Sequence, residues 1–295
     1  MRGRPLAWCV ALVITIGLAA FQRATGPTHP VRSWLKTSEG PVKIVLPRSH
    51  GGPGDLLIRL PEGVSMLAGS LVWRRFPTTD SWTVVPLVKK RGLLMARIPH
   101  QPPAGKVEYH LVLRSSGHRT IVFPSKKAVV ARFKGKIPIA VLVLHVLFMF
   151  LSMLFATRAV LAALGWDERA KRPAVLFSAI FLIVGGFVLG PIVQHYAFGA
   201  FWTGWPYGYD LTDNKTLLAF LAWLPAVVCV LRGKTSRLAI VAGWIVMMAV
   251  FLVPHSLHGS QIDWSSAPIS QTRRNAILEP SCIRRAHPVQ IKILT

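Results

Sequence analysis

GPIVQHYAFGAFWTGWPYGYDLTDNK, residues 190–215, joins two apolar segments and determines how the surrounding sequence is interpreted. A loop between two membrane helices needs only polar and flexible residues, whereas this one is rich in aromatic residues and glycine. It is also acidic, through Asp210 and Asp213, in a chain whose formal net charge is +24. We therefore interpret this stretch as a functional site rather than a simple connection.

The composition indicates an integral membrane protein. Of the 295 residues, 52% are hydrophobic, and the mean hydropathy is +0.45, which is too apolar for an ordinary soluble domain. Much of the basic charge lies in one extramembrane region and in the C-terminal tail, with no recognition motif, so nucleic acid is not an expected partner. The three cysteines form no C-x-x-C pattern, and neither a disulfide framework nor a c-type haem attachment is predicted.

Apolar segments predict four transmembrane helices after an N-terminal export signal. Residues 6–21 follow Arg2 and Arg4 and are typical of a signal peptide or signal anchor over residues 1–24; both possibilities stay open. The predicted four-helix domain occupies residues 138–260, and its apolar segments are 139–156, 174–194, 217–231 and 238–253.

The charges of the connections predict the orientation in the membrane. Residues 158–172 and 232–237 are basic, whereas the Trp-rich loop 196–214 carries two acidic residues before its end. Because positively charged loops stay in the cytoplasm, the Trp-rich loop is expected on the outer, periplasmic side of a bacterial-type inner membrane. A multi-pass protein of the cytoplasmic membrane is predicted.

Residues 30–134 predict a separate all-β domain on the same outer side. Short β-prone runs alternate with Pro- and Gly-rich turns, and in residues 106–111 every second residue can face a core. Seven or eight strands in this length are typical of an immunoglobulin-like or fibronectin-like sandwich. The expected fold is thus an α-helical membrane bundle with an exported sandwich. The basic tail, residues 261–295, lacks periodicity and is expected to be disordered.

Four histidines are predicted near the outer membrane face: His145, His195, His255 and His258. His145 lies seven residues beyond Pro138, which is about 10 Å into the membrane at ~1.5 Å per residue. Ionisable groups at this depth usually face a bundle interior or a site. A histidine at a helix end can instead meet the lipid headgroups, and that interpretation stays open for His195.

Several imidazoles at one membrane level indicate a shared ligand. Paired histidines suit the axial positions of a b-type haem, whose ring prefers aromatic and aliphatic walls. Three histidines with Asp210 or Asp213 would alternatively hold a copper or zinc ion.

The block WTGWPYGYD, residues 202–210, followed by Asp213 and a helix containing Trp223, resembles the tryptophan-rich signature of haem-handling membrane proteins of cytochrome c biogenesis. The resemblance covers about residues 175–260. The chain departs from that signature because it lacks a Trp-Asp-Pro run and has Asp213 in place of a glutamate. Residues 210–216 are also similar to a stretch in bacterial inner-membrane proteins of no assigned function.

The resemblance implies a haem platform with axial histidines on either side of it. Trp202, Trp205 and Asp210 would belong to the platform. The upstream axial ligand would be His145 or His195, and the downstream one His255 or His258. Residues in a supporting role would be Tyr209, Asp213 and Lys215.

Two function classes therefore stay open. The first is a membrane protein that binds or presents haem at the outer face. The second is a non-enzymatic accessory subunit of a membrane complex, whose sandwich binds a partner protein. In that case the Trp and Tyr residues form an interfacial belt, while Asp210, Asp213 and Lys215 pair and cap the next helix. Membrane lipid and other membrane or periplasmic proteins are the expected partners, and no catalytic residue is predicted.

Overall fold

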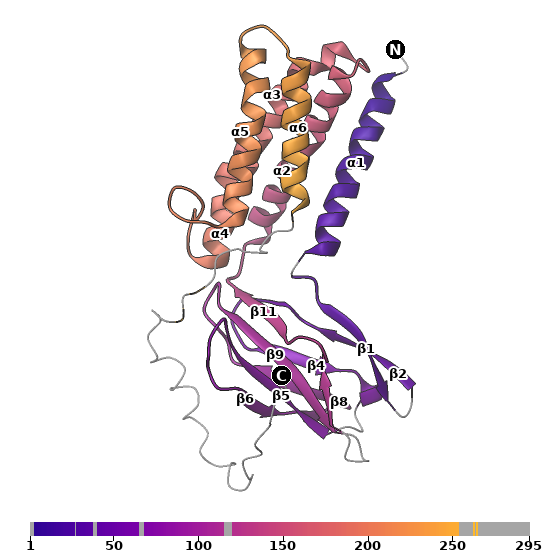
Figure 1. Cartoon of the computed structure of the whole chain (residues 1–295), viewed down its shortest axis with the longest axis vertical. Coiled ribbons are helices and arrows are strands. Elements are labelled where there is room, and N and C mark those ends of the chain that lie inside the picture. The colour runs from indigo at the N-terminus through magenta and orange to yellow at the C-terminus, as the bar shows by residue number, and fades with distance from the viewer. Residues whose placement is uncertain are drawn as a thin grey trace. The chain divides into compact units, whose positions relative to one another are not determined.

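A computed structural model describes residues 3–26, 28–37, 40–64, 68–114, 120–253, 262 and 264. The helices and the strands occupy different parts of the chain (Figure 1). One helix precedes the strands, which fall between Val31 and Lys134, and the other α-helices follow them. The predicted division into helical and all-β regions is therefore visible in the order of the elements.

Within the described residues, four helices are long and apolar enough to cross a membrane. The α-helices are α1 (Gly3–Thr25), α2 (Ile139–Ala163), α3 (Lys171–Leu182), α4 (Gly190–Phe198), α5 (Leu211–Leu231) and α6 (Arg237–Leu252). A π-helical segment, Ile183–Leu189, joins α3 to α4, so that one helical stretch covers Glu168–Phe198. This stretch and α1, α2 and α5 are the candidate spans, whereas α6 is shorter.

Small residues let the helices pack closely around one buried tryptophan. Ala156 and Ala159 of α2 are buried, and they share a core cluster with Ala174 and Val175 of α3. Trp223 of α5 is fully buried in this cluster, and its Nε1 donates a hydrogen bond to the carbonyl oxygen of Val175, 3.2 Å away. The indole N–H is therefore satisfied inside an apolar core.

The N-terminal helix α1 packs on the bundle through a row of small and polar residues. Ala7, Ala11 and Thr15 are fully buried, and Gln22 Nε2 donates a hydrogen bond to the Phe251 carbonyl oxygen of α6, 2.6 Å away. Trp8 meets the ring of Phe155 edge to face. These contacts join α1 to α2 and to α6.

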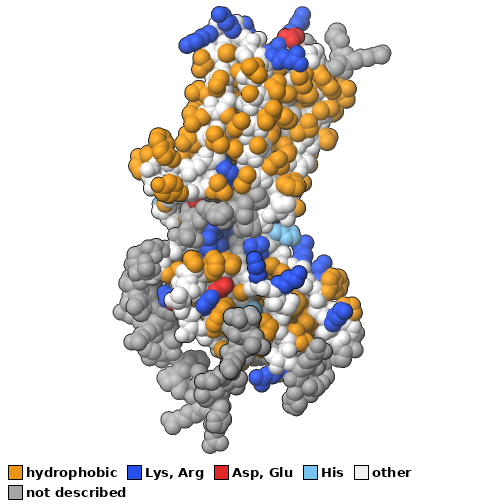
Figure 2. Space-filling view, in the orientation of Figure 1, with side chains coloured by type: hydrophobic (Ala, Val, Ile, Leu, Met, Phe, Trp, Pro, Cys, Tyr) orange, Lys and Arg blue, Asp and Glu red, His pale blue; other side chains and the backbone are white. Residues whose placement is uncertain are grey.

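The two basic connections lie at the same end of the bundle. Arg158 Nη2 donates to Asp167 Oδ2 at 2.8 Å, and Lys171 Nζ donates to Glu168 Oε2 at 2.6 Å. Arg172 donates to the Gly233 carbonyl oxygen, which joins the α2–α3 connection to the α5–α6 turn. Figure 2 shows hydrophobic side chains along the helices and Lys and Arg side chains gathered beyond this end.

The strands form three sheets around one apolar core. A six-stranded sheet has the order β3-β11-β9-β5-β6 with β10 beside β9, a three-stranded sheet has the order β4-β8-β7, and β1 pairs with β2. The bounds are β1 (Val31–Thr37), β2 (Gly40–Leu46), β3 (Ser49–Gly51), β4 (Leu56–Leu60), β5 (Ala68–Phe76), β6 (Thr83–Pro86), β7 (Val88–Lys90), β8 (Leu93–Ile98), β9 (Lys106–Arg114), β10 (Thr120–Phe123) and β11 (Val129–Lys134).

The alternation predicted in residues 106–111 forms β9. Its side chains alternate between buried and partly exposed, and Val107, Tyr109 and Leu111 are fully buried. The Tyr109 hydroxyl donates a hydrogen bond to the Pro47 carbonyl oxygen at 2.7 Å, and burial strongly raises the pKa of this phenol. The described residues form eleven strands here, more than the seven or eight expected.

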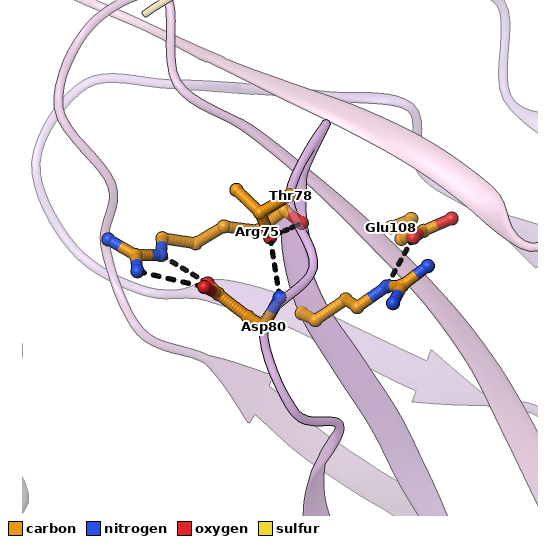
Figure 3. Close-up of polar contacts among 5 residues, drawn as sticks. Arg75, Thr78, Asp80 and Glu108 are labelled. Atoms are coloured by element: carbon orange, nitrogen blue, oxygen red, sulfur yellow. Dashed lines mark hydrogen bonds and ion pairs between the residues drawn. The ribbon is translucent and has the colours of Figure 1, made fainter. Parts of the chain in front are cut away.

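Two ion pairs lie on β5 and its neighbours (Figure 3). Arg74 Nε is 2.5 Å from Glu108 Oε1, across the β5–β9 pair. Arg75 Nε and Nη2 bind the two carboxylate oxygens of Asp80 at 2.5 and 3.1 Å. Asp80 keeps about a third of its side chain exposed, so water competes for these bonds.

Candidate functional site

The outer loop, residues 199–210, runs from the end of α4 to the start of α5 and contains most of the predicted aromatic platform. Asp210 ends the loop and caps α5, because its Oδ1 accepts hydrogen bonds from the backbone N–H groups of Thr212 and Asp213, at 2.7 and 3.4 Å. The helix thus begins at Leu211. This start lies before the apolar segment 217–231 that the sequence indicated.

Asp213 folds the outer loop back onto α5. Its Oδ2 accepts hydrogen bonds from the backbone N–H groups of Thr203 and Gly204, at 2.7 and 3.0 Å, and from Thr203 Oγ1 at 3.3 Å. The side chain is buried, with 5% of the residue exposed. Gly204 is required here because a Cβ at this position would lie 2.5 Å from Asp213 Cβ. Asp213 therefore determines the shape of the loop.

Residues on both flanking helices hold the remaining backbone of the loop. From α5, Asn214 Oδ1 accepts a hydrogen bond from the Trp205 N–H at 2.7 Å. From α4, Gln194 Nε2 donates to Thr203 Oγ1 at 2.6 Å. Within the loop, Trp202 Nε1 donates to the Trp205 carbonyl oxygen at 3.0 Å. Sequence inspection did not single out Gln194, Thr203 or Asn214, because nothing in the residue order shows which side chains reach the loop backbone.

Lys215 links this region to the end of α6. Its side chain is buried, and its Nζ donates a hydrogen bond to the Val253 carbonyl oxygen, just beyond Leu252. The predicted ligands His255 and His258 lie outside the described residues, but the chain that leads to them starts at this carbonyl. Lys215 thus places the beginning of that segment beside the first turn of α5.

The aromatic residues of the loop fall into two groups. Trp202 is packed inward, with its ring stacked on Phe187 at a centroid distance of 5.8 Å. The other group is exposed and consists of Trp205, Tyr207 and Tyr209, at 66, 83 and 94%. The predicted platform is therefore divided, since Trp202 faces the bundle whereas Trp205 is exposed.

His145 binds the π-helical segment between α3 and α4. Its Nδ1 is 2.9 Å from the Gly185 carbonyl oxygen, which can only accept, so Nδ1 carries the proton and donates. In the neutral ring, Nε2 then keeps a lone pair for a ligand. His145 lies seven residues before Ser152 and eleven before Ala156, both buried, so it shares the bundle-facing side of α2.

The glycines of the π-helical segment make this contact possible. A Cβ on Gly185 would lie 3.0 Å from Phe148 Cβ and 3.1 Å from the Met149 backbone nitrogen. Only glycine therefore lets the segment approach α2 closely enough for His145 to reach the carbonyl. π-Helical turns are frequent at functional sites, and this one was hidden in the sequence inside an apolar run.

His195 has a different environment. It lies in α4 with an exposed side chain, and its ring stacks on Phe201 with a centroid distance of 4.2 Å and an interplanar angle of 5°. In the described part of the chain, no three His, Cys, Asp or Glu residues are close enough to hold a metal ion. A copper or zinc site of three histidines and an aspartate would have to include His255 or His258.

The last strand of the six-stranded sheet meets α4 beside the outer loop. The Gly135 N–H donates a hydrogen bond to the Ala197 carbonyl oxygen at 2.9 Å, and the Arg132 guanidinium lies 5.5 Å from the Phe198 ring centroid. Burial and the charge of Arg132 together lower the pKa of Lys106, its cross-strand neighbour, to about 8. The sheet side of this junction is therefore basic.

No protein-family model, no curated protein and no solved structure matches this chain. The function must therefore be inferred from the chemistry of its own residues.

Proposed function

We propose that this protein binds haem b at the outer face of a bacterial-type inner membrane, with His145 Nε2 as one axial ligand. The observation that carries this proposal is the hydrogen bond from His145 Nδ1–H to the Gly185 carbonyl oxygen. A metal-ligating histidine almost always donates its other ring N–H to a carbonyl or carboxylate, which fixes the ring and its tautomer.

The surroundings of His145 suit a haem ring in composition. The flanking residues of α2 and the π-helical segment are aliphatic or aromatic, and Phe148 of α2 contacts Phe181 of α3 edge to face. A bound haem would supply an iron with two axial positions and a flat apolar ring. The protein would contribute the His145 imidazole at one axial position and apolar walls around the ring.

His145 is the better upstream ligand of the two candidates. His195 is exposed, so water can hydrate its ring nitrogens, and its ring stacks flat on Phe201. The second axial ligand is proposed to be His255 or His258, because Lys215 binds the carbonyl of Val253 from which that segment starts. Trp202, stacked on Phe187, is proposed as a wall of the haem site.

In this proposal, Asp210 and Asp213 stabilise the loop and do not bind the iron. Asp210 caps α5, and Asp213 binds the backbone of Thr203 and Gly204. Both carboxylates are thus engaged by N–H groups of the chain. In haem binding, the Asp210 and Asp213 carboxylates would hold the loop in place. Trp205 and Tyr209 would take part from the exposed surface of the loop.

The remaining finer predictions are also proposals. The basic turns are proposed to face the cytoplasm, which places the outer loop and the sheets on the periplasmic side. The sheet region is proposed to be an exported sandwich of the immunoglobulin or fibronectin class, which the buried alternation of β9 supports.

One observation favours the second function class, an accessory subunit. Trp205, Tyr207 and Tyr209 are strongly exposed, and exposed aromatic residues are frequent both at membrane interfaces and at protein interfaces. In that role the outer loop and the sheet region would contact other membrane or periplasmic proteins, and no haem would be bound.

The test is the haem and metal content of the protein purified in detergent after expression with added haem. A pyridine haemochrome assay and elemental analysis on the same sample measure both. We expect a stoichiometric b-type haem, lowered by the His255→Ala/His258→Ala double variant but unchanged by His110→Ala in β9. Protein with neither haem nor a stoichiometric metal would contradict the proposal and favour the accessory subunit.

A further inference from the structure

The outer loop carries four exposed aromatic residues, Phe201, Trp205, Tyr207 and Tyr209, which together are called the aromatic edge here. All four side chains are more than half exposed. Exposed aromatic groups of this number are costly in water, since each keeps apolar surface in contact with solvent. A favourable partner surface would therefore bury the rings and leave the hydroxyl and indole N–H groups hydrated.

The backbone beneath the edge is fixed rather than adaptable. Asp213 and Asn214 bind three consecutive backbone N–H groups, those of Thr203, Gly204 and Trp205. The Asp210 N–H in turn donates to the Thr203 carbonyl oxygen at 3.0 Å, and this bond closes the loop. The rings are thus presented outward by a framework that belongs to α5.

The length of α5 places the edge at the membrane boundary. α5 has 21 residues between the loop and the basic residue Arg232. At ~1.5 Å per residue this is about 31 Å, the thickness of the hydrocarbon core. With Arg232 at the cytoplasmic boundary, Leu211 lies at the outer one, and the loop lies in the headgroup layer.

The chemistry of the loop agrees with that depth. Residues 196–209 contain no Lys, Arg, Asp or Glu, although the formal net charge of the chain is +24. Along α5, Leu218, Leu221 and Leu224 are also exposed, and their spacing of three residues places them on one side of the helix. Tyrosine and tryptophan are the side chains enriched where one end of a ring is apolar and the other is hydrated.

We propose that the aromatic edge is a lipid-binding surface that lies in the phospholipid headgroup layer of the outer leaflet and anchors the outer loop there. The partner is the bilayer interface itself. A polar headgroup layer accommodates tyrosine hydroxyl groups, and the upper acyl chains accommodate the rings. This role does not require haem, because it rests on the exposure of the rings. Trp205 and Tyr209 also belong to the proposed haem-binding loop, whereas Tyr207 does not.

The test measures the depth of spin labels in the full chain reconstituted into phosphatidylcholine–phosphatidylglycerol vesicles. Cys9, Cys229 and Cys282 are replaced by Ser, and single cysteines are introduced by Tyr207→Cys or Tyr209→Cys. The matched controls are Ser81→Cys, exposed between β5 and β6, and Leu221→Cys, exposed near the middle of α5. Oxygen reports lipid exposure, and a water-soluble nickel chelate reports exposure to the aqueous phase.

We expect labels at 207 and 209 to be several-fold less accessible to the nickel chelate than the label at 81, and less accessible to oxygen than the label at 221. Accessibility equal to that at 81 would overturn the proposal, because the edge would then stand in water. Protection from both reagents would also overturn it, since protein would then cover the edge. Quenching of Trp205 fluorescence by lipids brominated near the headgroup, lost in Trp205→Phe, checks the same depth without a label.

Discussion

Asp213 in the outer loop and Asp80 beside β5 show what burial does to the same side chain. Each carboxylate accepts two or more hydrogen bonds, but Asp213 receives them from backbone N–H groups and is buried. Asp80 receives them from one arginine side chain and stays about a third exposed (Figure 3). The first contact determines the conformation of a loop, whereas the second joins two side chains that water also solvates.

Replacing Asp213 should have the largest effect on stability. Asp213→Ala leaves the N–H groups of Thr203 and Gly204 unpaired in a buried place, which costs about 2–5 kcal/mol. We expect a clearly lowered Tm in detergent by scanning fluorescence. Asp213→Asn keeps an acceptor oxygen and should lose less. A Tm unchanged in Asp213→Ala would show that the loop does not depend on this carboxylate.

Gly204→Ala tests the same contact from the other side. The new Cβ would lie 2.5 Å from Asp213 Cβ and 2.8 Å from Asn214 Oδ1, so the loop must shift. The expected cost is about 1–3 kcal/mol, typical of overpacking. Gly17→Ala is the matched control, because nothing lies within 4 Å of its new Cβ in α1. Equal thermal stability of the two variants would contradict the close packing of the loop on α5.

Asn214→Ala should be milder, at about 1 kcal/mol, because it removes one acceptor from an exposed N–H group that water can bind instead. Differential scanning calorimetry of this variant beside Asn214→Asp, which keeps an acceptor oxygen, measures the difference. If Asn214→Ala is as unstable as Asp213→Ala, burial is not what separates the two residues.

Asp80→Asn should have the smallest effect, below about 1 kcal/mol, since exposed ion pairs contribute little. The hydrogen bonds and charge of Arg75 lower the pKa of Asp80. The stabilisation is therefore present above the ordinary carboxyl pKa and is lost as the pH falls through the lower folded-state value. The difference in unfolding free energy between wild type and variant should be full at neutral pH and should shrink as the pH falls below the ordinary carboxyl pKa. A difference that grows on acidification would have the wrong sign.

The sequence was a good guide to the elements and a poor one to the site. Continuous apolar runs predicted the helices, and alternation predicted β9, because both patterns follow directly from which face is buried. The π-helical segment was missed, since its seven apolar residues look like the rest of the helix. The acidic residues of the loop were recognised as important, but their partners are backbone N–H groups, which have no signature in sequence.

His145 and His195 differ in the same way as Asp213 and Asp80: the first of each pair is bound by the backbone, and the second is more exposed to water. His145 is held by a carbonyl in the bundle, and His195 is exposed on a neighbouring ring. His145 lies near the start of α2 and His195 near the end of α4. The sequence named either as the upstream ligand but kept a headgroup contact open for His195. The difference between them arises from Gly185, which brings a carbonyl within reach of one imidazole only.

The reduced and oxidised absorption spectra of His145→Leu and His195→Leu, measured side by side with the wild type, test the central claim most directly. The account predicts a Soret band with sharp α and β bands on reduction in the wild type and in His195→Leu, and a loss or marked shift of these bands in His145→Leu. Identical spectra in His145→Leu and the wild type would contradict it, as would a wild type with no Soret band.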